Sequence, residues 1–278
     1  YDLQYWVGRT FKRPLPAWAP LETPLRRVPM LQSKFMPDAD VILAIDWTTA
    51  EGIHGYGAEK GAKFYRIAGY DTWAGPVERV EATWKMPFHK IAASSWLKEL
   101  GRTRFGHDLH GPIIPGVNFD LFYVRQKRWN RPKRIGMLYH SNPIKGVPDG
   151  LAALEMARAA HPKVRLVMYG TRKPKSGLPQ DVEFHENPPQ HKLREIYGSC
   201  DMWLWSSRLE GCGLVPMEAV ACQCALVATD VGAVRDYTIP GETALVSPPG
   251  DPKALAGNLL RLLEDEWELR RIARAGYS

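Results

Sequence analysis

The sequence has no long hydrophobic run. Its longest uninterrupted apolar segments, residues 41–45 and 224–228, contain five residues each, whereas a membrane-spanning helix needs about twenty. It is not a disordered or low-complexity chain either, because 45% of its 278 residues are hydrophobic and 24% are charged. It shows no secretory signal and starts at Tyr1 rather than at methionine, so we expect a trimmed or fragmentary start. What is left is a folded globular protein of about two domains.

Cysteine is scarce as well. All four cysteines lie within residues 200–224, and none forms a Cys-x-x-Cys pair. A structural zinc site needs two such well-spaced ligand pairs, and a disulfide scaffold needs cysteines spread through a short chain. We therefore expect reduced, partly buried thiols, as in a cytoplasmic protein.

Charge of one sign is only mildly in excess. The chain has 37 Lys and Arg residues against 30 Asp and Glu residues, a net charge of +7. The densest basic run, residues 125–134, contains no zinc-finger, RNP or basic-zipper pattern, so no nucleic-acid partner is expected. The run is either a solvated connector or a surface that attracts an anionic ligand or the anionic headgroups of a membrane.

What the chain does have is an alternation of short apolar strands with helical segments, which is typical of a parallel α/β sheet. Residues 1–37 are rich in proline and arginine and are expected to be irregular. In the first half we expect strands at 40–45, 63–67, 90–94 and 113–117 and a helix at 96–102. In the second half we expect strands at 134–140, 164–169, 182–185, 202–205, 225–229 and 243–246, and helices at 149–160, 190–197, 214–222 and 252–263.

Ligands of such sheets bind beyond the carboxyl ends of the strands. The segment after the expected strand 202–205 carries Glu210 and Glu218 on either side of a Gly-x-Gly turn that opens a helix. The glycines allow a ligand to approach the backbone, and the free N–H groups of the helix start attract anions. Both carboxylates could then accept hydrogen bonds from sugar hydroxyls. The alternative is that Glu210 is solvated and Glu218 only favours the helix dipole.

Three segments together resemble the retaining glycosyltransferases of family 4. They are the E-G-x-G-L-x-x-x-E-A motif of residues 210–219, the segment 222–236, and the segment 241–251. The resemblance implies an α/β protein of GT-B type, with two Rossmann-like doubly wound domains facing a cleft. The first domain (residues 1–125) would be an incomplete acceptor-side domain, nearest to bacterial rhamnosyltransferase-like members. The second (residues 126–278) would bind the nucleotide-sugar.

The resemblance also implies roles for individual residues. Glu218 would hold the ribose of the nucleotide, Glu210 would lie beside the donor sugar, and Lys145 would bind the diphosphate, so that Glu210 and Lys145 are the candidate catalytic residues. His140 stands where the family commonly has a diphosphate-binding arginine, and Asp71 is a candidate for orienting the acceptor hydroxyl. The remaining donor-binding candidates are backbone groups near strand ends, at Gly170, Gly211, Cys212, Gly213 and Leu214.

The sequence therefore predicts a retaining hexosyl- or rhamnosyl-type transferase that moves a sugar from a nucleotide-diphosphate donor to a hydroxyl of a carbohydrate or glycolipid. No cofactor and no catalytic metal are expected. The protein would be cytoplasmic and could contact the inner face of an anionic membrane. The alternative left open is a non-catalytic nucleotide-sugar-binding or scaffold protein of the same fold, since the diphosphate-binding arginine is replaced by His140 and the first strands of the acceptor domain are missing.

Overall fold

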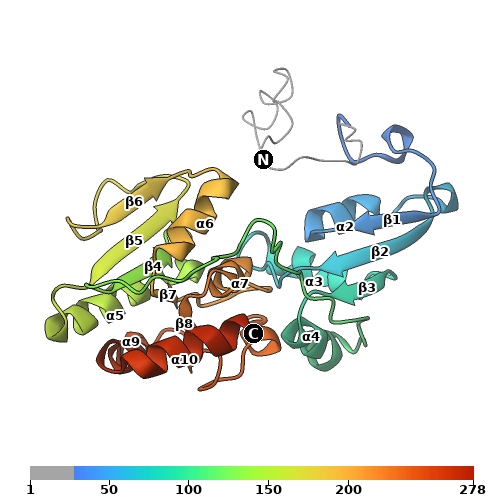
Figure 1. The fold of residues 1–278 in the computed structure, drawn as a ribbon. Coiled ribbons are helices and arrows are strands. Elements are labelled where there is room, and N and C mark those ends of the chain that lie inside the picture. Colours follow the sequence, from blue (N-terminus) through green and yellow to red (C-terminus); the bar gives the residue numbers. More distant parts are fainter. Residues whose placement is uncertain (1–27) are drawn as a thin grey trace. The chain divides into compact units, whose positions relative to one another are not determined.

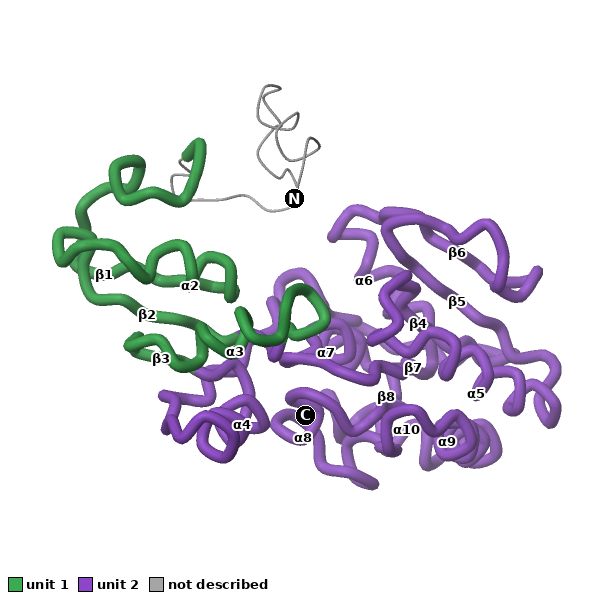
Figure 2. Tube along the Cα trace, turned by 180° about the vertical axis from the view of Figure 1, so that it is seen from behind, with its two compact units in different colours: residues 1–67, 71–91 green, residues 68–70, 92–278 purple. Residues whose placement is uncertain are grey.

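The computed structural model describes residues 28–278, and the chain folds as two compact units (Figures 1 and 2). Of the described residues, unit 1 comprises 28–67 and 71–91, and unit 2 comprises 68–70 and 92–278. Most of the irregular segment expected at residues 1–37 lies outside the described residues. The domain boundary expected at residues 125 and 126 stays a prediction.

Unit 1 contains a small sheet in the order β1-β2-β3, in which β1 (Val41–Ala44) and β2 (Ala62–Ile67) are parallel. The third strand, β3 (His89–Ala92), ends at the border with unit 2. The first crossover contains α2 (Trp47–Ile53) and the second contains α3 (Val77–Lys85). Two 3-10 turns, η1 (Ser33–Phe35) and η2 (Ala58–Lys60), complete the unit.

The first helix of unit 2 is α4 (Ser95–Phe105), and strands and helices then alternate, except that β6 directly follows β5 and α10 directly follows α9. Its strands are β4 (Arg134–Leu138), β5 (Arg165–Gly170), β6 (Glu183–Glu186), β7 (Met202–Trp205), β8 (Ala225–Thr229) and β9 (Leu245–Ser247). Its other helices are the turn η3 (Pro143–Lys145), α5 (Val147–Ala160), α6 (Gln190–Gly198), α7 (Leu214–Ala221), α8 (Val234–Tyr237), α9 (Pro252–Glu264) and α10 (Glu266–Tyr277).

The six strands of unit 2 form one parallel sheet in the order β6-β5-β4-β7-β8-β9. The chain therefore builds the sheet outward from β4 in one direction and then, starting with β7, in the other. The order reverses between β4 and β7, and such a switch point is where open α/β sheets leave a crevice at the carboxyl ends of their strands. The predicted doubly wound α/β fold is confirmed for this unit.

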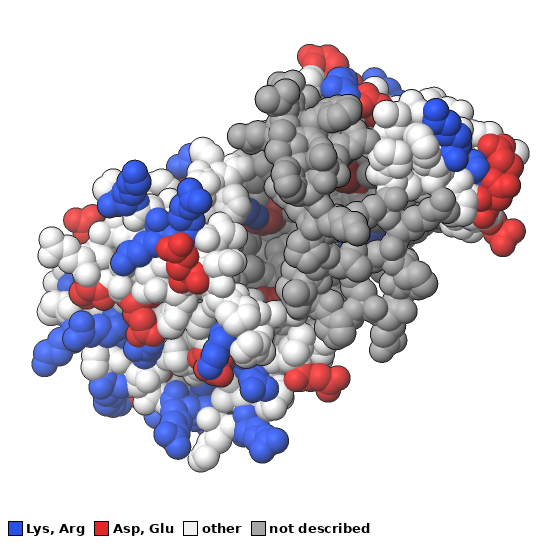
Figure 3. All heavy atoms as spheres, turned by 90° about the horizontal axis from the view of Figure 1, so that it is seen from above, with Lys and Arg blue, Asp and Glu red and all other residues white. Residues whose placement is uncertain are grey.

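Helices cover both faces of this sheet (Figure 1). Along β7, Met202 and Leu204 pack with residues of α5, α9 and α10, whereas Trp203 and Trp205 pack on the opposite face with residues of α6 and α7. Because successive side chains of a strand point to opposite faces, a strand buried on both faces is apolar throughout, and all four residues of β7 are buried. Figure 3 shows Lys, Arg, Asp and Glu side chains on the surface of the face it draws, but Asp149 and Asp201 are buried.

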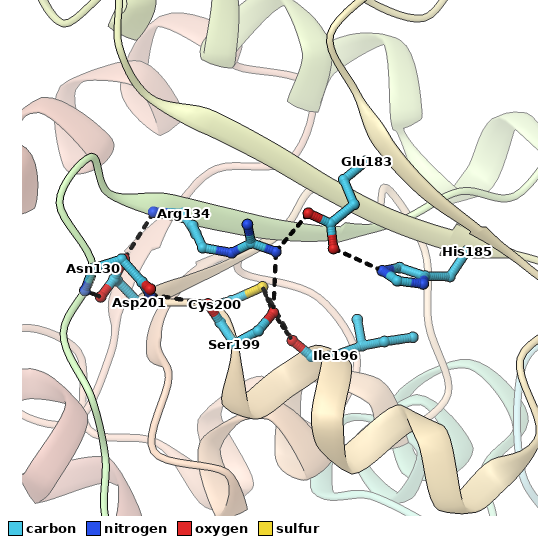
Figure 4. Close-up of polar contacts among 8 residues, drawn as sticks. All are labelled: Asn130, Arg134, Glu183, His185, Ile196, Ser199, Cys200 and Asp201. Atoms are coloured by element: carbon cyan, nitrogen blue, oxygen red, sulfur yellow. Dashed lines mark hydrogen bonds and ion pairs between the residues drawn. The ribbon is translucent and has the colours of Figure 1, made fainter.

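A buried polar network holds the amino-terminal edge of the sheet (Figure 4). The carboxylate of Asp201, which is fully buried, accepts hydrogen bonds from the backbone N–H of Asn130 (2.8 Å), from the Asn130 side chain (3.1 Å) and from the backbone N–H of Arg134 (2.7 Å). Asp201 directly precedes β7, Asn130 precedes β4, and Arg134 is the first residue of β4. The network therefore fixes these two strands at the edge opposite to their carboxyl ends.

Several regions differ from the sequence expectation. Residues 113–117 form no strand, and Ile113 makes a backbone hydrogen bond to Ala92 (2.8 Å) in an extended connection that contains Pro112 and Pro115. Proline lacks the N–H that a strand pairs with, which explains the wrong prediction. The helices α2, α3, α8 and α10 were not among the expected elements. Among the described residues, no helix is both long and apolar enough to cross a membrane.

Candidate functional site

The loop after β4 presents Lys145 at the switch point. The side chain of Asn142 accepts a hydrogen bond from the backbone N–H of Ile144 (3.1 Å) and thereby caps the turn η3, which ends at Lys145. Gly146 follows with φ +57°, and a Cβ atom there would lie 1.9 Å from the carbonyl oxygen of Ser206. Only glycine tolerates both this backbone conformation and this approach. It lets the loop after β4 touch the loop after β7.

Glu210 lies in the loop after β7 and forms an ion pair with Lys145. The Nζ atom of Lys145 is 2.6 Å from Oε1 of Glu210, and the hydroxyl of Ser207 donates a hydrogen bond to the same oxygen (2.8 Å). The Glu210 side chain is only 9% exposed, whereas that of Lys145 is 23% exposed. The ammonium also lies 5.7 Å from the centre of the Trp205 ring. The cation is therefore held between a carboxylate and an aromatic face at the carboxyl ends of β4 and β7.

A second contact ties these two loops together. The guanidinium of Arg208 forms two hydrogen bonds, of 2.7 and 2.8 Å, with the carboxylate of Asp149, which is buried in the first turn of α5. The backbone N–H of Arg208 also donates to the carbonyl of Ile144 (2.6 Å). These contacts hold the residues next to Lys145 and Glu210, so the ion pair sits on a fixed frame.

The predicted backbone sites Gly211, Cys212, Gly213 and Leu214 form the connection from Glu210 to α7. Gly213 has φ +86° and directly precedes the helix, while Cys212 is buried and Leu214 is exposed. The carbonyl of Gly211 accepts a hydrogen bond from the indole N–H of Trp96 (2.8 Å). No side chain caps α7, so its first backbone N–H groups can donate to an anion.

Glu218, on α7, ends a chain of hydroxyl groups. The hydroxyl of Tyr197 donates to Oε2 of Glu218 (2.7 Å) and lies 2.7 Å from the hydroxyl of Tyr169. Burial raises the pKa of Glu218 from 4.5 to about 6, although the hydrogen bond from Tyr197 opposes this shift. Burial also raises the pKa of Tyr197 well above its usual value. At neutral pH this arrangement leaves a fixed carboxylate oriented by a neutral tyrosine.

Two further predicted donor-binding residues lie at neighbouring strand ends. His140 is exposed after β4, and its Nδ1 atom accepts a hydrogen bond from the backbone N–H of Asn142 (3.0 Å), which leaves Nε2 as the proton-bearing nitrogen. Gly170 is buried at the end of β5, where a Cβ atom would lie 2.7 Å from the carbonyl oxygen of Tyr139. Both residues lie at the carboxyl-end edge of the sheet, as do Lys145 and Glu210.

Asp71, the predicted acceptor residue, belongs to unit 1. Burial raises the pKa of Asp71, and the negative charge of nearby Asp46 raises it further. A hydrogen bond with Trp73 lowers this pKa but does not cancel the increase. The expectation of no catalytic metal rested on the absence of an Asp-x-Asp metal site, but unit 1 contains an Asp-x-Asp sequence at Asp38 and Asp40. Asp38 forms an ion pair with Lys60 (2.6 Å). Among residues 28–278, no group of three His, Cys, Asp or Glu side chains is placed to hold a metal ion.

The sequence did not single out four residues that shape the site, namely Asp149, Tyr197, Ser207 and Arg208. Ser207 and Arg208 directly follow a predicted strand, and that position is a signal that could have found them. Nothing in the local sequence distinguishes Asp149 or Tyr197, because their partners are 59 and 21 residues away in the chain.

Comparison with known proteins gives one family for most of this unit. Residues 123–278 match the family described as "Glycosyl transferases group 1". The chain is 29% identical over 188 residues to a glycogen synthase of Mycobacterium tuberculosis, covering 60% of this chain and 45% of the relative. It is 35% identical over 100 residues to a D-inositol 3-phosphate glycosyltransferase of Frankia alni, covering 36% of this chain and 25% of the relative. The chain spans half or less of the length of these relatives.

The fold also has solved counterparts. The structure of a TarM mutant from Staphylococcus aureus, in complex with fondaparinux, α-GlcNAc-glycerol and UDP, matches with a TM-score of 0.71 and 13% sequence identity, covering 84% of this chain and 51% of that chain. This likeness shows the fold, and the predicted α/β fold of GT-B type is thereby confirmed.

Proposed function

Because the chain belongs to the glycosyl transferases group 1 family, we propose that it transfers a sugar from a nucleotide-diphosphate donor to an acceptor hydroxyl. The observation that carries this proposal is the pair of Lys145 and Glu210 at the switch point of the sheet, next to the uncapped start of α7. A cation and free helix N–H groups suit a diphosphate, whereas a carboxylate beside them suits sugar hydroxyls.

In the proposed reaction, the bond between the anomeric carbon and the diphosphate oxygen breaks, and the acceptor oxygen bonds to the same carbon. The departing diphosphate gains negative charge, which Lys145 and the start of α7 would stabilise. The proton of the acceptor hydroxyl passes to a diphosphate oxygen. Because acceptor and leaving group use the same face of the sugar, the anomeric configuration is retained. This proposal follows the resemblance to family 4 and requires neither a metal nor a cofactor.

Within this reaction the predicted site residues keep their proposed roles. Glu218 would accept hydrogen bonds from the ribose hydroxyls, since its carboxylate is fixed by Tyr197. Glu210 would lie beside the donor sugar, and Asp71 would orient the acceptor hydroxyl. The other donor-binding residues would be His140 and Gly170 together with the backbone of residues 211–214. We propose a hexosyl or rhamnosyl donor and a carbohydrate or glycolipid acceptor.

We also propose that the protein works in the cytoplasm, in peripheral contact with an anionic membrane and without a nucleic-acid partner. Supporting this, Figure 3 shows many Lys and Arg side chains on the outer surface of unit 2. Arg125, Arg128 and Arg194 also line one surface groove of this unit. Sedimentation with vesicles of phosphatidylglycerol, compared with neutral phosphatidylcholine vesicles, tests this contact.

The enzymatic proposal is tested in two steps. A thermal-shift panel of UDP, GDP, ADP and dTDP identifies the base, because a ligand at a hundred times its Kd stabilises the fold by about 2.7 kcal/mol. The matching nucleotide-sugars are then incubated with the protein and simple glycosides, with and without EDTA, and the product is analysed by NMR. We expect the new glycosidic bond to have the same anomeric configuration as the donor. We also expect the same rate of product formation with and without EDTA. Nucleotide binding without hydrolysis or transfer of any donor would contradict the proposal.

A further inference from the structure

A cavity lies in unit 2, beside the loop that carries Glu210. It has a volume of about 530 Å³ and is bounded by α4, by the loops after β7 and β8, and by α8. Its lining includes the side chains of Trp96, Glu99, Leu209, Val231, Asp230, Arg235 and Asp236. Neither the sequence motifs nor the proposed donor site assigns a role to this cavity.

The cavity shares a wall with the proposed donor site. The indole N–H of Trp96, which lines the cavity, donates to the carbonyl of Gly211 (2.8 Å). On the other wall, a Cβ atom on Gly232 would lie 2.8 Å from Cβ of Glu210, so the loop after β8 lies directly against Glu210. A molecule in the cavity is therefore a near neighbour of whatever binds at Glu210.

The chemistry of the walls fits a carbohydrate. Trp96 is half-buried and lies with Leu209 and Val231 on the apolar part of the lining. Indole rings pack against the C–H faces of sugar rings because they offer a large, rigid apolar surface. Carboxylates of Glu99, Asp230 and Asp236 stand around this surface, and carboxylates are acceptor-only groups that suit hydroxyl donors.

The charge of the walls discriminates between classes of carbohydrate. Of the charged side chains described along the lining, three are acidic and one, Arg235, is basic. The guanidinium of Arg235 is already held by the carboxylate of Asp230, through contacts of 2.6 to 2.9 Å. The carboxylate of Glu99 is also paired, with the guanidinium of Arg102. A phosphate group placed here would meet the carboxylate of Asp236 and an arginine that is already held by Asp230, and this arrangement disfavours it.

We propose that this cavity is an acceptor subsite for neutral carbohydrate, and that it disfavours phosphorylated acceptors such as inositol phosphate. The inference rests on the proposed function, because the cavity is an acceptor subsite only if a donor binds at Glu210. It separates this chain from its relative in Frankia alni, which is a D-inositol 3-phosphate glycosyltransferase.

Saturation-transfer NMR on the full chain tests the inference, with and without UDP. The neutral probes are maltose and the methyl α-glycosides of glucose, mannose and rhamnose, and the charged probe is D-inositol 3-phosphate. We expect saturation of the ring protons of at least one neutral probe and none of the charged probe. The proposal would be overturned if no neutral probe received saturation from the protein. It would also be overturned if inositol phosphate displaced a bound neutral probe.

Variants place the binding in the cavity. Trp96→Ala should lower the affinity for the neutral probe at least tenfold. Trp96→Phe, which keeps an aromatic ring but loses the hydrogen bond to Gly211, should restore most of that affinity. Trp267→Ala is the matched control, because this indole is 72% exposed on α10 and does not line the cavity. Equal binding by the parent and a folded Trp96→Ala variant would overturn the assignment.

A charge variant decides the question independently of Trp96. Asp230→Asn removes one carboxylate and releases Arg235, so it should admit D-inositol 3-phosphate while leaving the neutral probe bound. A folded Asp230→Asn variant that still excludes the inositol phosphate would contradict the charge argument. Calorimetric titration of the parent protein with UDP tests the donor site on its own. Failure to bind any nucleotide would count against the donor site and not against carbohydrate binding in the cavity.

Discussion

The Nζ atom of Lys145 lies 2.6 Å from Oε1 of Glu210, although 65 residues separate them in the chain. The contact joins the loops that follow β4 and β7, the two strands between which the strand order of the sheet reverses. If Lys145 binds the diphosphate as proposed, the diphosphate would compete with this carboxylate for the ammonium, and nucleotide binding would exchange the partner of Lys145.

Replacing Lys145 should weaken nucleotide binding directly. In Lys145→Ala the diphosphate loses a charge-assisted hydrogen bond, which contributes about 1.5–3 kcal/mol. We expect the affinity for UDP, or for the nucleotide that the thermal-shift panel selects, to fall at least tenfold in calorimetry. Lys192→Ala is the control, because Lys192 forms an exposed ion pair with Glu195 on α6. Equal losses in the two variants would point to a general charge effect.

Gly146 should be essential for the site in a way that another left-handed glycine is not. Gly146→Ala combines a strained backbone (φ +57°) with a Cβ atom 1.9 Å from the carbonyl oxygen of Ser206, whereas Gly177→Ala has a similar strain (φ +87°) and open space. Left-handed strain alone costs about 1–2 kcal/mol. We expect Gly177→Ala to lower the free energy of unfolding by that amount, and Gly146→Ala to lower it further and to abolish nucleotide binding. Similar stability and binding in the two variants would contradict the described loop contact.

Glu218 should make stability depend on pH in an unusual direction. Its pKa is raised from 4.5 to about 6, so the folded protein holds this proton more tightly than the unfolded chain does. The stabilising contribution is present below about pH 4.5 and is lost as the pH rises through 6, with an upper limit of about 2 kcal/mol. Urea titrations of Glu218→Gln and the parent should show the variant gaining relative stability between pH 4.5 and 7.5. A constant difference across this range would argue against the buried carboxylate.

Asp201 should stabilise the fold without taking part in binding. Asp201→Ala leaves two backbone N–H groups and the Asn130 side chain without their acceptor, at a cost of about 3 kcal/mol. Asp181→Ala removes an exposed partner of Arg158 and should cost about 1 kcal/mol or less. At a temperature where Asp201→Ala remains folded, nucleotide affinity should equal that of the parent, because the network lies at the opposite strand ends. Weaker binding by the folded variant would contradict this separation.

The sequence predicts the central strands β7 and β8 well because they are runs of buried, mostly apolar residues. The expected ranges 202–205 and 225–229 coincide with β7 and β8, which are buried on both faces. The expected strand at 113–117 is wrong. Apolar residues next to proline occur both in strands and in extended loops, so the local pattern does not distinguish the two. The expected helix 252–263 coincides with α9, whereas α10, which begins directly after it with Asp265 as its cap, was missed.

For the site, the sequence indicates which residues follow the strand ends, but it does not indicate which side chains contact one another. That Lys145 and Glu210 follow separate strands of one sheet is readable from the sequence, because the carboxyl ends of parallel strands share an edge. Their ion pair also requires the strand order, which places β4 beside β7 and is fixed only by tertiary packing. The hydrogen bond from Tyr197 to Glu218 is hidden from local patterns for the same reason.

The most direct test of the central claim compares Glu210→Gln with Glu218→Gln by calorimetric titration with UDP and with UDP-glucose, or with the nucleotide and nucleotide-sugar that the thermal-shift panel selects. Glu218→Gln should weaken binding of both ligands by about 1.5–3 kcal/mol, because the ribose loses its charged acceptor. Glu210→Gln frees Lys145 and should bind the plain nucleotide at least as tightly as the parent, while losing affinity for the sugar-bearing donor. The assignment of the two carboxylates would be wrong if Glu210→Gln lowered the affinity for the plain nucleotide. It would also be wrong if a folded Glu218→Gln variant bound the plain nucleotide as tightly as the parent.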